Sequence, residues 1–226
     1  MNVAIFGGTF DPVHRGHLAV ARAAQRAFKL GRIYFVPADI PPHKQRQPIT
    51  DYLHRYAMLT LALRDEKTFV PSTMEAPVHS SNTGQGAKPN YSIDTVRRFR
   101  KTLAKRDRLF FVVGIDMFQD IGTWHRSEEL LREVEFIVVS RPGYKLGSGL
   151  RVPAPRKDKI SPQETRSATK DNQSKIHWLG DVAENVSSTE LRAALASGRA
   201  SRKLLDEAVV EYIRKEHLYI GPGRTV

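Results

Sequence analysis

The segment from Gly7 to His17 constrains the fold of this chain more than any other feature. It reads Gly-Gly-Thr-Phe-Asp-Pro-Val-His-Arg-Gly-His and lies between a short apolar stretch, 3–6, and an alanine-rich stretch, 15–28. The first stretch predicts a buried strand and the second a helix. Gly7 and Gly8 let the backbone turn tightly and let a bulky anion approach where a Cβ would block it. The chain therefore opens with a strand-loop-helix unit.

The same segment predicts an anion site. The helix presents its free N–H groups and the positive end of its dipole to the glycine turn. His14 and His17 are three residues apart and so share one face of its first turn. The segment lacks the Gly-Lys-Ser/Thr of a Walker A loop and the Gly-x-Gly-x-x-Gly of a dinucleotide fold, and the histidines lack the His-Glu-x-x-His spacing of a zinc helix. These features favour phosphate binding over a plain glycine turn with surface histidines.

The rest of the chain alternates short apolar strands with helices. Strands are predicted at residues 3–6, 33–36, 69–73, 109–114, 136–140 and 176–179, and helices at 15–28, 52–64, 93–105, 128–133, 188–196 and 202–217. Nearly continuous apolar strands between helices indicate a parallel sheet covered on both faces. We therefore expect one α/β domain over residues 1–226, a Rossmann-like doubly wound fold with the C-terminal helices packed on the same domain. Ligands should bind beyond the carboxyl ends of its strands.

Charge and composition limit the classes of protein that the chain can represent. The net charge of +12 comes from residues 97–108 and 141–175, because the remainder carries 20 basic and 20 acidic residues. Residues 144–174 are rich in Pro, Ser and basic side chains, which predicts a flexible loop. Most of residues 97–108 fall in the helix predicted at 93–105, and its Arg97, Arg98, Lys101 and Lys105 are expected to face water, so nucleic-acid binding is the weaker interpretation. The chain has no cysteine and no apolar run long enough for a membrane span, which favours a cytoplasmic protein.

Further motifs extend the first one along nearly the whole chain. They are Pro41-Pro42-His43-Lys44, Tyr91-Ser92-Ile93-Asp94-Thr95, Gly114-Ile115-Asp116 with Trp124, Ser140-Arg141-Pro142-Gly143, and Val186-Ser187-Ser188-Thr189-Glu190-Leu191-Arg192. Together with the first segment they resemble the nucleotidyltransferases that share a His-x-Gly-His signature, and among them the bacterial nicotinate mononucleotide adenylyltransferases. Each later motif is weak alone, but their shared order is specific. The segment 144–174 departs from the family by being longer and more basic.

The resemblance implies a reaction and a site. It implies transfer of AMP from ATP to nicotinate mononucleotide, with pyrophosphate released and Mg²⁺ carried on the ATP phosphates rather than in a protein metal site. The implied catalytic residues are His14, His17, Lys44 and Arg192. The implied ATP-binding residues are Gly7, Gly8, Thr9, Phe10, His14, Gly16, His17, Gly114, Asp116, Ser188, Thr189 and Arg192. The implied mononucleotide-binding residues are Lys44, Tyr91, Ser92, Thr95 and Trp124.

The residues themselves leave several roles open. Asp116 either caps the helix that follows it or binds ribose hydroxyls, and Ser92 either caps a helix or helps its N–H groups to receive a carboxylate. Trp124 either anchors a small core or stacks on the pyridine ring. The serines near Thr189 either cap a helix or bind phosphate. A sister transferase acting on phosphopantetheine or a polyol phosphate, or on nicotinamide mononucleotide, is the main rival. The sequence leaves open whether the chain forms a homo-oligomer.

Overall fold

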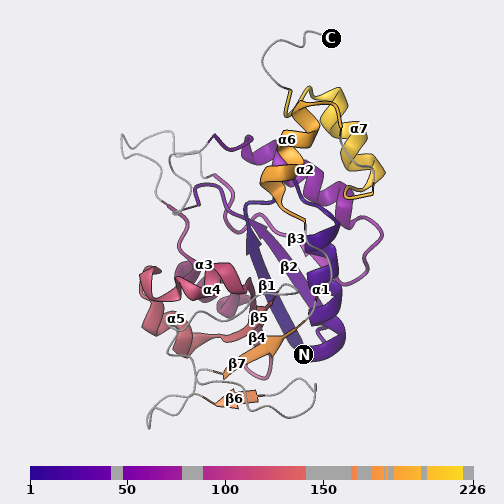
Figure 1. The fold of residues 1–226 in the computed structure, drawn as a ribbon. Coiled ribbons are helices and arrows are strands. Elements are labelled where there is room, and N and C mark those ends of the chain that lie inside the picture. The colour runs from indigo at the N-terminus through magenta and orange to yellow at the C-terminus, as the bar shows by residue number, and fades with distance from the viewer. Residues whose placement is uncertain are drawn as a thin grey trace.

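A computed structural model of the chain describes residues 1–41, 48–77, 89–140, 164–166, 175–180, 182, 186–199 and 203–220. In these ranges seven strands form one sheet with the order β3-β2-β1-β4-β5-β7-β6 (Figure 1). The strands are β1 Asn2–Gly8, β2 Arg32–Pro37, β3 Phe69–Pro71, β4 Arg108–Gly114, β5 Glu135–Val139, β6 Glu164–Arg166 and β7 Lys175–Leu179. Neighbouring strands from β3 to β7 are parallel, which confirms the predicted α/β sheet.

Seven α-helices and a short 3-10 helix accompany the sheet in the described ranges. They are α1 Arg15–Phe28, α2 Tyr52–Leu63, α3 Ser92–Thr102, α4 Ile115–Gln119, η2 Ile121–Thr123, α5 Ser127–Glu133, α6 Ser188–Ala196 and α7 Glu207–Lys215. The last helix begins later than predicted because the Asp206 carboxylate accepts the Ala208 amide and caps it there. The short α4 and η2 were not predicted, since neither is long enough to show a helical period.

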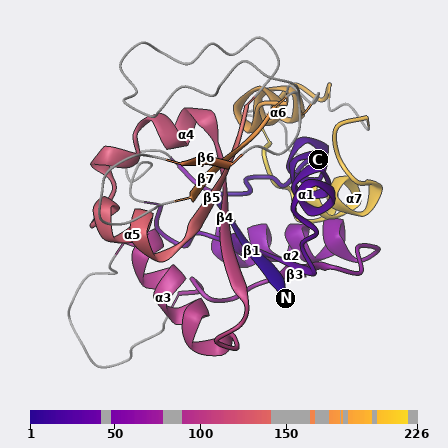
Figure 2. The same cartoon turned by 90° about the horizontal axis from the view of Figure 1, so that it is seen from below.

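Strand side chains alternate between two apolar layers. Ala4 and Phe6 of β1 face the layer formed with α1, α2, α6 and α7, whereas Val3 and Ile5 face the layer formed with α3, α4 and α5. Figure 2 shows these two groups of helices on opposite sides of the sheet. Burial on both faces explains why the central strands are apolar at nearly every position. The C-terminal helices α6 and α7 join the first of these layers, as predicted.

The order of the strands creates a crevice. From β1 the chain adds β2 and β3 on one side, and it later adds β4, β5 and β7 on the other side. Connections that leave β1 and β4 therefore pass to opposite faces of the sheet, and a crevice opens at their carboxyl ends. Gly7 and Gly8 end β1 and Gly114 ends β4 at this switch point.

The basic segment 97–108 differs from expectation. Arg97 of α3 does not simply face water, because its guanidinium pairs with Glu129 and Glu133 of α5 and joins the two helices. Arg108 likewise pairs with Glu135 of the neighbouring strand. These arginines therefore connect neighbouring elements of the fold.

The strand β6, which is antiparallel to β7, was not predicted. The rest of the segment 144–174 lies outside the described residues, so its flexibility stays a prediction. None of the described helices is both long and apolar enough to span a bilayer.

Candidate active site

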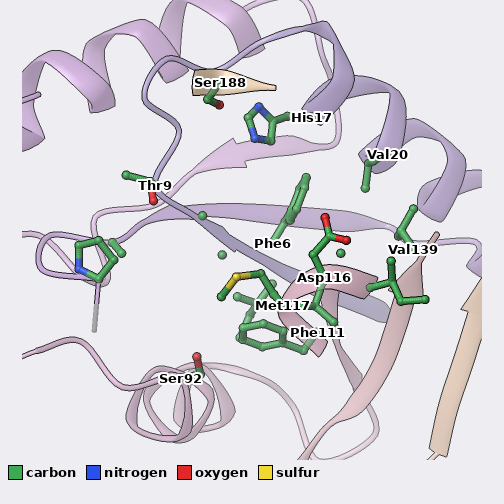
Figure 3. A pocket seen from close by; sticks show the side chains of 18 of the residues that line it. Phe6, Thr9, His17, Val20, Ser92, Phe111, Asp116, Met117, Val139 and Ser188 are labelled. Carbon is green, nitrogen blue, oxygen red and sulfur yellow. The ribbon is translucent and has the colours of Figure 1, made fainter. Parts of the chain in front are cut away.

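A cavity of about 710 Å³ occupies the switch point at the carboxyl ends of β1 and β4. Most of the residues singled out from the sequence line it. These are Gly7, Gly8, Thr9, His14, Gly16, His17, Tyr91, Ser92, Gly114, Asp116, Trp124, Ser188 and Thr189. In Figure 3, His17 and Ser188 lie toward one side of the cavity and Ser92 lies toward the other, with Phe111, Asp116 and Met117 between them.

Two stacked histidines form one end of the cavity. The rings of His14 and His17 lie 3.7 Å apart between centroids and 28° from parallel. The backbone N–H of His14 donates to Nδ1 of His17 over 3.2 Å. A ring nitrogen that accepts a hydrogen bond carries no proton, so the proton of neutral His17 lies on Nε2. His14 is the N-cap of α1, so both rings stand at the positive end of that helix.

The start of α6 lies at the same end. Ser187 is its N-cap, and its side chain makes no capping hydrogen bond. Ser187, Ser188 and Thr189 all line the cavity. The structure thus brings a second helix N-terminus, with hydroxyl groups not used for capping, to the cavity that the histidines line. This combination suits a polyphosphate, because N–H groups, hydroxyls and two helix dipoles all favour negative charge.

The opposite end is aromatic. Tyr91 is the N-cap of α3, and its ring stacks on His125 with 4.2 Å between centroids. Trp124 packs edge to face on Phe111, 6.2 Å between centroids. Ser92 is the first residue of α3 rather than its cap. The first helical bonds to the Tyr91 carbonyl come from Asp94 and Thr95, so the helix itself does not use the N–H groups of Ser92 and Ile93.

Several predicted residues do not line the cavity. The Phe10 side chain is buried among the rings of Phe6 and Phe35. Thr95 is buried and donates its hydroxyl to Glu75 over 2.5 Å. Arg192 donates from Nη1 to the backbone oxygen of Asp11 over 2.7 Å. Lys44 lies outside the described residues.

Two other expectations change in detail. Asp116 lines the cavity and does not cap α4, whose N-cap is Gly114, so the capping interpretation is wrong. The N–H of Trp124 donates to the Ile121 carbonyl over 3.1 Å. This N–H is therefore already used within the turn. A carboxylate receptor at this end of the cavity would rely on the N–H groups of α3.

A buried arginine holds the loops around the cavity. Arg55 of α2 is 1% exposed and donates to four backbone carbonyls. Nε donates to Thr50 over 2.7 Å, Nη1 donates to Thr9 over 2.9 Å and to Ala38 over 2.7 Å, and Nη2 donates to Asp39 over 3.4 Å. Burial lowers the pKa of this guanidinium, and the nearby Asp11 and Asp39 oppose the shift. The guanidinium stays charged, because an arginine does not lose its proton in a protein. It ties the loop after β1 to the loop after β2.

Glu75 contributes a buried carboxyl group to the cavity wall. Its side chain is nine-tenths buried and lines the cavity. Burial raises the pKa of Glu75, while the hydrogen bond from Thr95 and the charge of Arg98 act against the rise. Asn90, also in the wall, accepts the Ile40 amide on its Oδ1 over 2.9 Å. Sequence reasoning missed Glu75, Asn90 and His125. Only His125, next to Trp124, carried a local signal.

Comparison with known proteins finds similar sequences over nearly the whole chain. The cytidylyltransferase-like family model matches residues 5–194. A Solibacter usitatus protein described as a probable nicotinate-nucleotide adenylyltransferase is 38% identical over 219 residues, which cover 97% of this chain and 100% of that protein. The chain belongs to the nicotinate-nucleotide adenylyltransferase family. Another member of this family, from Thermoanaerobacter, is 35% identical over 97% of the chain and 94% of its own length.

A solved structure supports the fold of this nicotinate-nucleotide adenylyltransferase family member. The Plasmodium falciparum nicotinic acid mononucleotide adenylyltransferase complexed with NaAD superposes with a TM-score of 0.69 at 20% identity, over 96% of this chain and 97% of that one. The relatives above show that the chain is a nucleotidyltransferase, and the superposition supports its Rossmann-like α/β fold, as the sequence motifs predicted.

Proposed function

We propose that the chain transfers AMP from ATP to nicotinate mononucleotide, forming nicotinate adenine dinucleotide and pyrophosphate in NAD biosynthesis. A phosphate oxygen of the mononucleotide forms a bond to the α-phosphorus of ATP, and the bond from that phosphorus to the bridging oxygen breaks. The observation that carries the proposal is one cavity with a phosphate-binding end, at α1 and α6, and an aromatic end at Tyr91 and Trp124. Two nucleotides joined through their phosphates match this arrangement.

The reaction needs no general base. The phosphate of the mononucleotide has its second pKa near ~6 and is already an anion at neutral pH. Catalysis then consists of aligning this oxygen with the α-phosphorus and stabilising the charge that develops on the phosphate oxygens. The Nε2–H of His17 is the donor best placed for this, because His14 holds the other ring nitrogen. His14, Lys44 and Arg192 add positive charge or donors in the proposed site.

Mg²⁺ enters with ATP as part of the substrate complex. Within the described residues there is no group of three or more His, Asp or Glu side chains that could hold a metal ion. Asp116 is nevertheless in the cavity wall, where it can accept hydrogen bonds from a ribose.

The N-terminus of α3 favours nicotinate over nicotinamide. The N–H groups of Ser92 and Ile93 and the helix dipole offer donors to a carboxylate. An amide would turn its own N–H₂ toward those donors and leave buried groups unpaired, at a cost of about 1–3 kcal/mol each. We expect a preference of at least ~10²-fold in kcat/KM, since two such mismatches supply it.

Pyrophosphate release from ATP with a panel of acceptors tests the proposal. The panel contains nicotinate mononucleotide, nicotinamide mononucleotide, phosphopantetheine and glycerol 3-phosphate. We expect fast release with the first alone. Equal efficiency with nicotinamide mononucleotide would contradict the donor-lined pocket but not adenylyl transfer. Release with phosphopantetheine or glycerol 3-phosphate alone would assign the chain to a sister transferase. We propose a cytoplasmic location for this reaction.

A further inference from the structure

Asp11, in the loop that follows β1, joins three distant parts of the chain. Its side chain is buried, with 3% exposure. Oδ1 accepts the hydroxyl of Tyr219 over 2.5 Å, and Oδ2 accepts the Thr50 amide over 3.2 Å. The backbone oxygen of the same residue accepts Nη1 of Arg192 over 2.7 Å. One residue of the loop therefore contacts α6, the segment before α2 and the C-terminal segment.

Tyr219 reaches Asp11 from 208 positions further along the chain. It follows α7, whose Val209 and Ile213 are buried in the core, so packing of that helix sets where the phenol lies. The backbone of Tyr219 has φ 60°, in the left-handed region that a residue with a Cβ seldom adopts. Burial and the neighbouring Asp11 carboxylate raise the pKa of the phenol, so it remains a hydrogen-bond donor. A conformation of this cost persists where its contacts outweigh it.

We propose that Tyr219 is a positioning residue for adenylyl transfer, acting through Asp11 on Arg192 and on the loop over residues 9–14. The proposal rests on the proposed function. Asp11 holds Arg192 through its backbone and Tyr219 through its side chain, so a shift of this residue moves both. Without the phenol hydroxyl, one oxygen of a buried carboxylate loses its donor, and the loop must move or admit water to satisfy it. The same loop carries His14 of the histidine pair.

A second tyrosine of the same region provides a matched control. Tyr212 of α7 also bonds to a distant helix through its hydroxyl, which lies 2.9 Å from Nδ1 of His54 on α2. This bond connects α7 to α2 but has no contact with Asp11 or the cavity wall. If Tyr219 served stability alone, its substitution would affect kcat no more than substitution of Tyr212.

The experiment compares Tyr219→Phe with Tyr212→Phe in the full chain. We expect Tyr219→Phe to lower kcat by ~10- to 100-fold, the scale of a displaced catalytic group, with the KM for the mononucleotide within twofold of wild type. Tyr212→Phe should keep wild-type kcat, and both variants should melt within a few degrees of each other. If kcat of Tyr219→Phe falls no more than that of Tyr212→Phe, the proposal is wrong.

Two further measurements test the route of the effect. In an Arg192→Ala background, Tyr219→Phe should lower kcat by a smaller factor than in the wild-type background, because interacting residues are not additive. The full loss in that background would overturn the route through Arg192. Amide hydrogen exchange should speed up at residues 9–14 in Tyr219→Phe and stay unchanged in Tyr212→Phe. This readout needs no turnover, so it tests the coupling of Tyr219 to the loop even if no acceptor of the panel reacts. Unchanged exchange in both variants would count against it.

Discussion

The buried guanidinium of Arg55 offers the sharpest test of how the cavity loops are held. In Arg55→Met an unbranched apolar side chain replaces the aliphatic stem of the arginine, and every donor is lost. The carbonyls of Thr9, Ala38 and Thr50 then lose donors at 2.7–2.9 Å. Hydrogen bonds to a charged group contribute about 1.5–3 kcal/mol each, and they are not additive. We therefore expect a loss of ~3–5 kcal/mol in the free energy of unfolding, the range for breaking a buried charged network.

That loss corresponds to a fall of ~6–20 °C in Tm for a chain of this size. Urea denaturation at 25 °C measures the free energy directly, and thermal melting gives Tm. Activity should also be lower than in the wild type at temperatures below the melting transition, because Thr9 and Ala38 both line the cavity. The substitution therefore links the stability of the two loops to turnover.

Arg22→Met is the matched control. Arg22 of α1 pairs with Glu66, but its side chain is 48% exposed, and exposed pairs contribute about 0–1 kcal/mol. The two substitutions remove the same chemical group from a buried and from an exposed site. If Arg55→Met lowers the unfolding free energy by no more than about 1 kcal/mol beyond Arg22→Met, the carbonyl network does not hold the loops.

Three further substitutions test single side chains. Burial raises the pKa of Glu75 above its ordinary 4.5. The contribution of this side chain to stability is therefore full below about pH 4.5 and is lost as the pH rises through the raised pKa. Urea titrations across pH should show that Glu75→Gln removes this decline, and an unchanged profile would contradict the prediction. For Glu135, burial raises the pKa, but the hydrogen bonds from His177 and Arg108 outweigh it and lower the pKa to about 2. Stability should therefore fall between about pH 4.5 and pH 2, and less so in Glu135→Gln, which acid melting curves measure. His17→Ala should lower kcat by ~10²-fold or more with little change in mononucleotide binding, and wild-type turnover in steady-state assays would refute its assignment to the phosphates.

The sequence was sufficient where structure depends on neighbours in the chain. The apolar runs predicted the strands of the parallel sheet, and the segment Gly7–His17 predicted the start of α1 at its observed position. The predicted turn at Gly7 and Gly8 is wrong, because both glycines are extended residues of β1 paired with β2, and the left-handed residue of the loop is Phe10. The correct predictions are local, since a strand or helix period is visible within a dozen residues. The motifs at Ser188 and Tyr91 then reached the same cavity because parallel strands send their carboxyl ends to one edge.

Tertiary structure decided which side chains meet and what each one does there. Phe10 lies inside the first motif, yet its ring packs in the core, and Arg97 pairs with Glu129 of α5. Glu75 enters the cavity wall and Tyr219 bonds to Asp11 from the far end of the chain. No local pattern marks such pairs, because the chain path between them, and not their spacing in sequence, sets their distance. A periodicity reports which face of an element is apolar, while the partner on that face is selected only when the layers pack.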